Sequence, residues 1–168
     1  MNRSMKVRKA ALHGVLGAIA LASITALAQD RPARPGRVIL DEAPLDKVVR
    51  YSHSDVTALF RRAYNEHLGV VRMLEGGEFN VNIRHFQDVT PESFSMLTHP
   101  DTIDVWVVQE GTGTIAIGGE RVGDRYVGTE EFTVGVGDLV FIPAGIPHGV
   151  KESKLLTFFN IRFPEHRN

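Results

Sequence analysis

The sequence predicts an all-β fold, an antiparallel β-sandwich or barrel, with one short helix on the N-terminal side of the strands. From residue 69 onward, apolar and polar residues alternate with a period of two, in runs short enough for strands. Gly or Pro bounds each run, and no helix-length apolar pattern separates one run from the next. The 168 residues, 43% of them apolar and 23% charged, are enough for one domain with a sizeable core.

The first 28 residues have the layout of a secretory signal peptide. Four basic residues come first: Arg3, Lys6, Arg8 and Lys9. The uncharged stretch 10–28 follows and ends in Ala26-Leu27-Ala28, the small-x-small pattern of a cleavage site. The alternative is an uncleaved membrane anchor, because such a stretch nearly suffices to cross a bilayer. We expect cleavage after Ala28, and a periplasmic or secreted protein that has no membrane span once the signal is removed.

The composition argues against several classes of function. Residues 1–28 contain four basic and no acidic side chains, so the mature chain keeps 15 basic and 20 acidic ones, a net charge of −5. An acidic chain is not expected to bind nucleic acid or an anionic membrane surface. The chain has no Cys, which excludes disulfides, thiolate nucleophiles and Cys-ligated metal sites.

The elements follow in order along the mature chain. Residues 29–50 begin Pro- and Arg-rich and are expected to form an extended N-terminal arm, with the folded domain at 51–168. Ser54-Asp55 offers a helix N-cap ahead of apolar residues at helical spacing, which predicts a helix over about 55–67. Seven strands are then expected: 69–74, 78–86, 105–108, 112–117, 125–132, 138–142 and 155–163.

Residues 137–148 carry a resemblance to a known family. They read Gly-Asp-Leu-Val-Phe-Ile-Pro-Ala-Gly-Ile-Pro-His and match the second motif of the cupins, G-x5-P-x-G-x2-H, at every fixed position. The Asn that usually follows four residues later is Glu152 here. The resemblance implies a cupin double-stranded β-helix, a jelly-roll barrel, with His148 as a metal ligand in its interior. It also implies a homodimer, because cupins commonly pair through their sheets.

The first cupin motif is only partly present. Asp104 and Gly111 match its E-x6-G end, with Asp in place of Glu. Counting back along the motif aligns its second His with His99 and its first His with Leu97, which cannot bind a metal. The resemblance therefore implies three metal ligands, His99, Asp104 and His148, where the usual metal-binding cupin has four. Two imidazoles and a carboxylate suit a divalent ion such as Mn, Fe, Zn or Cu.

A second ligand set remains open. His99-Pro100-Asp101 is an H-x-D pair, and together with His148 it resembles the facial triad of oxoglutarate-dependent oxygenases. Arg162 would then bind a co-substrate carboxylate. A metal-free pocket is the further alternative, with His99 as a hydrogen-bonding residue and Asp104 as a turn former.

The strand at 80–86 offers candidate catalytic groups. Alternation puts Asn80, Asn82 and Arg84 on one face and Val81, Ile83 and His85 on the other. If the polar set faces the barrel interior, Arg84 can orient a substrate carboxylate or enolate. If the other set does, His85 can replace the ligand missing at position 97. The sequence does not decide between the two faces. Trp106 is expected on the same face as Asp104.

Three functions follow as hypotheses. The first is a metal-dependent enzyme for a small organic substrate, of the dioxygenase, isomerase or lyase type found among cupins. The second is a non-catalytic barrel that binds a small ligand in the periplasm. The third is a partner-binding dimer in which the arm 29–50 adds to a neighbour's sheet edge.

Overall fold

The structure is a computed structural model, and it describes residues 36–42, 48–76 and 79–166. The expected signal peptide 1–28 lies outside the described residues. Residues Ala33–Asn168 form one compact unit. Within the described ranges, no helix is both long enough and apolar enough to cross a bilayer.

One helix and nine strands make up the described fold, which confirms the all-β prediction. In chain order they are β1 (Gly36–Glu42), α1 (His53–Asn65), β2 (Leu68–Glu75), β3 (Asn80–Val89), β4 (Thr102–Ile117), β5 (Glu120–Val122), β6 (Arg125–Val127), β7 (Glu130–Gly135), β8 (Leu139–Ile142) and β9 (His148–Pro164). The main sheet has the order β1-β2-β3-β9-β4-β7, with β8 also paired to β4. All of its pairs are antiparallel except β1 with β2.

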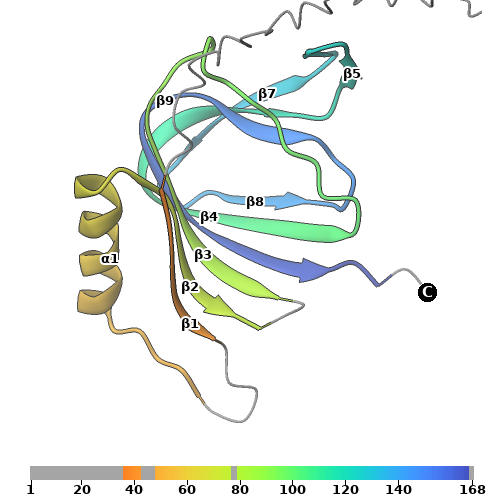
Figure 1. The fold of residues 1–168 in the computed structure, drawn as a ribbon. Coiled ribbons are helices and arrows are strands. Elements are labelled where there is room, and N and C mark those ends of the chain that lie inside the picture. The colour runs from red at the N-terminus through yellow and green to blue at the C-terminus, as the bar shows by residue number, and fades with distance from the viewer. Residues whose placement is uncertain (1–35, 43–47, 77–78, 167–168) are drawn as a thin grey trace, which may run out of the picture. The chain divides into compact units, whose positions relative to one another are not determined.

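Two long strands shape the barrel. β4 and β9 pair along nearly their whole lengths, and the register shifts between Val108 and Glu110 and twice between Thr112 and Ile115. Such bulges bend a strand and increase its twist. The first part of β4 pairs with β8 and the last part with β7, so the bent strands form two facing walls (Figure 1). The segment between β3 and β4 crosses the open side between those walls (Figure 1).

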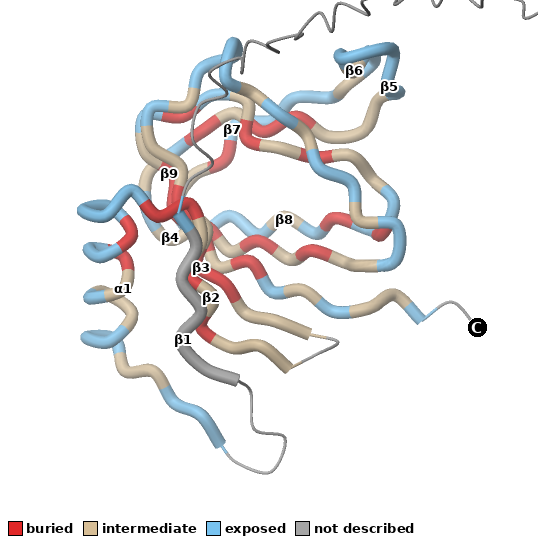
Figure 2. Tube along the Cα trace, viewed as in Figure 1, coloured by how far each residue is buried: buried red, intermediate tan, exposed pale blue. Residues whose placement is uncertain are grey.

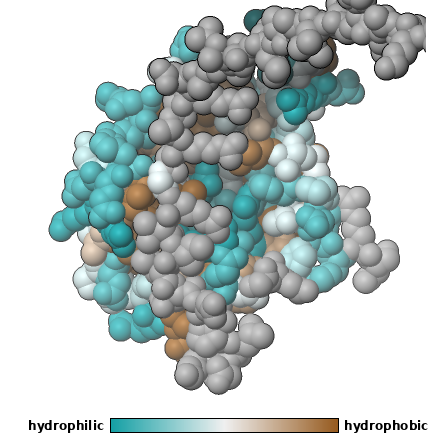
Figure 3. All heavy atoms as spheres, in the orientation of Figure 1, coloured by the Kyte–Doolittle hydropathy of each residue, from teal (hydrophilic) through white to brown (hydrophobic). Residues whose placement is uncertain are grey.

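Helix α1 covers the outer face of β2 and β3. Ser52 caps its N-terminus by accepting from the Asp55 N–H, while the Asp55 side chain accepts from the Ser52 N–H. The buried residues Phe60 and Ala63 pack in one apolar cluster with Ile83 of β3. The buried part of α1 lies on the side that faces the strands (Figure 2). The surface over α1 is mostly hydrophilic (Figure 3).

Several element boundaries differ from expectation, and β9 begins at His148 and not at residue 155. The helix begins two residues earlier, because Ser52 and not Ser54 provides the cap. The strands expected at 105–108 and 112–117 are one strand, β4, since the bulges bend the chain without ending the ladder. The strand expected at 125–132 divides into β6 and β7 at the positive-φ residue Gly128.

The described part of the expected arm pairs with its own chain. Strand β1, which lies within the expected arm 29–50, pairs in parallel with β2 of its own chain. Residues 36–42 therefore complete the edge of this chain's sheet.

Candidate metal centre

Three side chains expected as metal ligands meet in the barrel interior. Asp104 comes from β4, His148 begins β9, and His99 lies in the segment that leads into β4. One ligand atom from each lies within 4.8 Å of the others, and the described residues hold no other such group of three. His148 Nε2 is 2.9 Å from Asp104 Oδ2, and His99 Nε2 is 3.8 Å from the same oxygen.

Backbone hydrogen bonds hold the segment before β4 against the start of β9. Leu97 and His148 form an antiparallel bridge in which each N–H donates to the other's carbonyl at 2.9 Å. Gly145 turns the chain with a φ of 81°, and its N–H donates to the His99 carbonyl at 2.6 Å. A Cβ at Gly149 would lie 2.4 Å from a carbonyl oxygen of that segment. The glycines of this turn therefore allow both imidazoles to reach Asp104.

The orientation of the His148 ring prepares one nitrogen for a cation. Its Nδ1 lies 2.8 Å from the Ile146 carbonyl oxygen, which can only accept, so Nδ1 carries the hydrogen. In the neutral ring Nε2 then has a lone pair, yet it faces the Asp104 carboxylate at 2.9 Å. Two acceptors at this distance require a proton or a cation between them. An imidazole held through its other nitrogen in this way is typical of metal ligands.

Asp104 is fully buried and paired with Arg162. The two residues lie directly opposite each other in the β4–β9 register. Asp104 Oδ1 accepts from Arg162 Nε at 2.5 Å, and Oδ2 accepts from Nη2 at 3.3 Å. Burial alone would raise the pKa of Asp104, but hydrogen bonds from His148 and Arg162 outweigh it and lower the pKa below 3.8. The carboxylate is therefore charged at neutral pH.

Arg162 also contacts His99. Its Nη2 donates to His99 Nε2, because a guanidinium has no acceptor atom. Burial and then the Arg162 charge lower the pKa of His99, which favours the neutral ring. His99 and Asp104 therefore both present electron pairs to one point, where the guanidinium provides the positive charge. This donor set fits a divalent ion if the Arg162 guanidinium moves away from His99 Nε2.

Strand register arranges the other interior side chains in rows beside the cluster. Asp104 and Arg162 belong to the first row. The second row joins three neighbouring strands through Trp106, Asn160 and Asn82. The third row holds Val108, Phe158 and Arg84. Residues directly opposite on neighbouring strands have Cβ atoms about 5 Å apart, so the side chains within each row lie next to one another.

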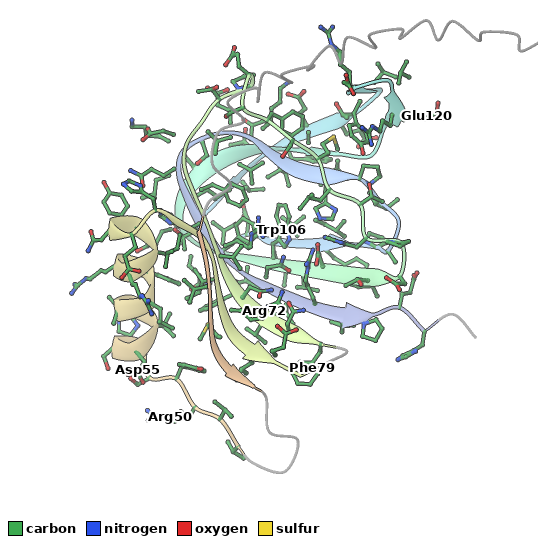
Figure 4. All side chains as sticks on the ribbon, viewed as in Figure 1. Arg50, Asp55, Arg72, Phe79, Trp106 and Glu120 are labelled. Carbon is green, nitrogen blue, oxygen red and sulfur yellow. The ribbon has the colours of Figure 1, made fainter. Side chains whose placement is uncertain are left out.

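A small cavity lies against the cluster. It has a volume of about 70 Å³, and Arg84, Asp104, Trp106, His148 and Asn160 are among the residues that line it. Figure 4 shows Trp106 inside the barrel, where its ring stacks on Phe158 with the centroids 4.4 Å apart. A larger hollow of about 690 Å³ beside the β5–β6 hairpin contains none of the three ligands, so the chemistry points to the smaller one.

The structure separates the two candidate catalytic residues. Arg84 lines the cavity, so the polar face of β3 is the one that faces the interior. His85 lies on the opposite face, where its ring meets Tyr64 of α1 edge-on and its Nδ1 lies 2.9 Å from Thr157 Oγ1. His85 therefore cannot replace the ligand missing at position 97, and its place beneath the helix keeps it from the cluster.

The remaining sequence candidates also have definite positions. Asp101 is exposed and accepts from Thr102, so the clustered carboxylate is Asp104 and the H-x-D set is not the one assembled. Leu97 is 48% exposed and lines the cavity beside His148. Trp106 shares the interior face with Asp104, as predicted. Sequence reasoning missed Asn160, although alternation along the expected strand 155–163 places it on the same face as Arg162.

Comparison with known proteins supports the fold. The family model described as "Cupin domain" matches residues 85–156. A comparison with curated proteins finds no match. A protein of Bacillus halodurans, solved at 1.41 Å resolution, superimposes with a TM-score of 0.51 at 19% identity, over 74% of this chain and 86% of that one.

Two further solved structures resemble the chain more distantly. Hydroxypropylphosphonic acid epoxidase from S. wedmorenis, in complex with fosfomycin, aligns with a TM-score of 0.43 at 13% identity. That alignment covers 51% of this chain and 44% of the epoxidase, so this chain spans less than half of that protein's length. A protein of Photorhabdus luminescens aligns with a TM-score of 0.38 at 24% identity, over 51% of this chain and 62% of that one.

Proposed function

Because the barrel of this chain belongs to the cupin superfamily, we propose that it binds a divalent metal ion through His99, Asp104 and His148 and acts as an enzyme on a small organic substrate. One observation carries the proposal: a carboxylate oxygen and an imidazole nitrogen lie 2.9 Å apart in the barrel interior, a pair that needs a proton or a cation between its atoms, and a second imidazole lies beside them. A divalent ion at this point would polarise a substrate oxygen. The reaction type we propose is that of the dioxygenase, isomerase or lyase cupins.

The side chains around the cluster have separate tasks in this proposal. Arg84 lines the cavity and supplies a positive charge that orients an anionic group of the substrate. Arg162 holds Asp104 Oδ1, which leaves Oδ2 directed toward both imidazoles. Phe86 and Phe158 form an apolar wall that limits the access of water to the same cavity. His85, beneath α1, has no part in the reaction.

Calorimetry on chelator-treated protein tests this function. Titration with Zn(II), Mn(II), Cu(II) or, without oxygen, Fe(II) should show one site per chain, and His148→Ala should remove it. His53→Ala is the matched control, because His53 lies exposed at the start of α1. Affinity order favours Cu and Zn, whereas the carboxylate and the cupin resemblance favour Mn and Fe, so the titration also ranks these ions by affinity. Wild-type protein that takes up none of these ions would refute the proposal.

A metal-free barrel that binds a small ligand is the second candidate function. The position of Arg162 favours it, since this guanidinium already neutralises Asp104 and donates to His99. In that case the cavity binds its ligand through Arg84 and Arg162 without a metal. Protein that stays metal-free in excess ion but still binds a small anion would support this reading over the enzyme.

Export and dimerisation complete the proposal. We propose that residues 1–28 direct export and that the mature chain begins at Gln29 in the periplasm or outside the cell. Intact mass of the exported protein should match that start, and a retained Met1 would contradict it. A homodimer is supported by Leu139, Phe141, Ile161 and Phe163, which are exposed at 65%, 57%, 37% and 37% and share the outer face of β8, β4 and β9.

A further inference from the structure

The second interior row, next to the metal-binding cluster, contains two buried polar atoms that no protein group satisfies. Trp106 Nε1 is a hydrogen-bond donor and Asn160 Oδ1 an acceptor, and neither has a partner within the described structure. Both residues are only 4% exposed. Leaving a buried donor or acceptor without a partner costs about 1–3 kcal/mol, so each such atom in a folded protein calls for an explanation.

The two atoms belong to neighbouring side chains. Trp106 on β4 lies directly opposite Asn160 on β9, and both line the cavity that also contains Asp104 and His148. A donor and an acceptor on paired residues that line one cavity can bind a molecule that carries an acceptor next to a donor. The cavity volume of about 70 Å³ favours a small ligand.

The charges around the cavity select the chemistry of that ligand. Arg84 and Arg162 line it with two positive charges against the single negative charge of Asp104, before any metal is added. An anionic acceptor group is therefore favoured beside Trp106, and a cationic donor such as an ammonium group is disfavoured beside Asn160. A neutral donor is therefore favoured there, and a hydroxyl is the smallest one.

We propose that this cavity binds a small hydroxycarboxylate, whose carboxylate accepts from Trp106 Nε1 and whose hydroxyl donates to Asn160 Oδ1. This inference rests on the proposed function, because it names the substrate class of the same site. Trp106 and Asn160 are then its specificity-determining residues. Arg84 contributes attraction for the carboxylate, and the cluster of His99, Asp104 and His148 lies in the adjoining row.

Binding of lactate, propionate and alanine tests the proposal directly. Propionate lacks the hydroxyl, and alanine replaces it with an ammonium group. Lactate should bind about tenfold more tightly than either, since one satisfied hydrogen bond at a buried site is worth about a factor of ten. Trp106 is the only tryptophan of the chain, so tryptophan fluorescence reports binding at this one position, and calorimetry gives the same constants independently.

Two variants separate the roles of the two atoms. Asn160→Leu should reduce lactate binding to the level of propionate and leave propionate unchanged. Trp106→Phe, measured by calorimetry, should weaken lactate and propionate alike by about tenfold. Asn65→Leu, at an exposed position of α1, is the control and should change the affinity for neither lactate nor propionate. Should Trp106→Phe fail to fold, Asn160→Leu alone still decides the matter.

The outcomes distinguish this inference from the metal proposal. The titrations are made with chelator-treated and with Zn(II)-treated protein. Zn(II) uptake without any preference for lactate would overturn the ligand assignment and leave the metal site standing. A lactate preference that Asn160→Leu abolishes, in protein that takes up no Zn(II), would support the ligand assignment and refute the metal site.

Discussion

Replacing Asp104 by Asn should destabilise the protein strongly, because this carboxylate joins both walls of the site. Its side chain is 1% exposed, accepts from Arg162 and lies 2.9 Å from His148 Nε2. Removing one partner of a buried ion pair costs about 3–5 kcal/mol, since the other charge stays buried and unpaired. Asn still offers one oxygen to Arg162, and the Arg162 side chain is 18% exposed, so we expect a loss of about 3 kcal/mol.

Thermal unfolding followed by circular dichroism measures this loss. For a chain of 168 residues, about 3 kcal/mol corresponds to a decrease in Tm of about 6–12 °C. The scan is made with a chelator present, so that the ion pair alone is tested. Asp101→Asn is the matched control, because Asp101 is exposed and its carboxylate accepts from the neighbouring Thr102 hydroxyl, and the Tm of this variant should not change. A Tm for Asp104→Asn within 2 °C of wild type (about 0.5–1 kcal/mol) would refute the reasoning.

Three further predictions concern pH, the missing ligand and assembly. The pKa of Asp104 is lowered from 3.8, so its stabilisation is complete above pH 3.8 and is lost as the pH falls through the lowered pKa; the Tm difference between wild type and Asp104→Asn should therefore narrow only below pH 3.8, and a gap that already closes at pH 6 would contradict this assignment. Leu97→His should tighten Zn(II) binding about tenfold or more in calorimetry, because residue 97 pairs with His148 and shares its face; unchanged affinity would show that the new imidazole does not reach the ion. Phe141→Glu should convert a dimer to a monomer in light scattering with its circular dichroism unchanged, whereas wild-type protein that is already monomeric at micromolar concentration would remove the dimer proposal.

The sequence predicted the parts of the site that depend on local patterns. The turn at 143–148 is a compact motif, and its resemblance to the second cupin motif correctly implied that His148 faces the interior. Period-two alternation correctly placed Trp106 on the same face as Asp104. Both inferences need only the residues on either side, so one chain without any structure was enough to make them.

Other features depend on contacts between distant segments. Helix α1 determines which face of β3 points into the barrel. It packs against Ile83, and its Tyr64 ring contacts His85, so Arg84 on the opposite face lines the cavity. The pairing of Arg162 with Asp104 joins residues 58 positions apart and follows from the β4–β9 register, which the bulges in β4 shift. A period of two gives the face of each strand but not its register with a partner, so this ion pair was not predictable.

Metal content is the most direct test of the central claim, that His99, Asp104 and His148 form a metal centre. Wild-type protein and the His99→Ala/His148→Ala double variant are saturated with Zn(II), desalted and measured by mass spectrometry for metal per chain. The variant should unfold at a similar temperature in chelator, so that loss of metal is not loss of fold. We predict about one ion per wild-type chain and almost none in the double variant, because one carboxylate alone cannot hold the ion. Equal metal in both proteins, or none in the wild type, would contradict the account.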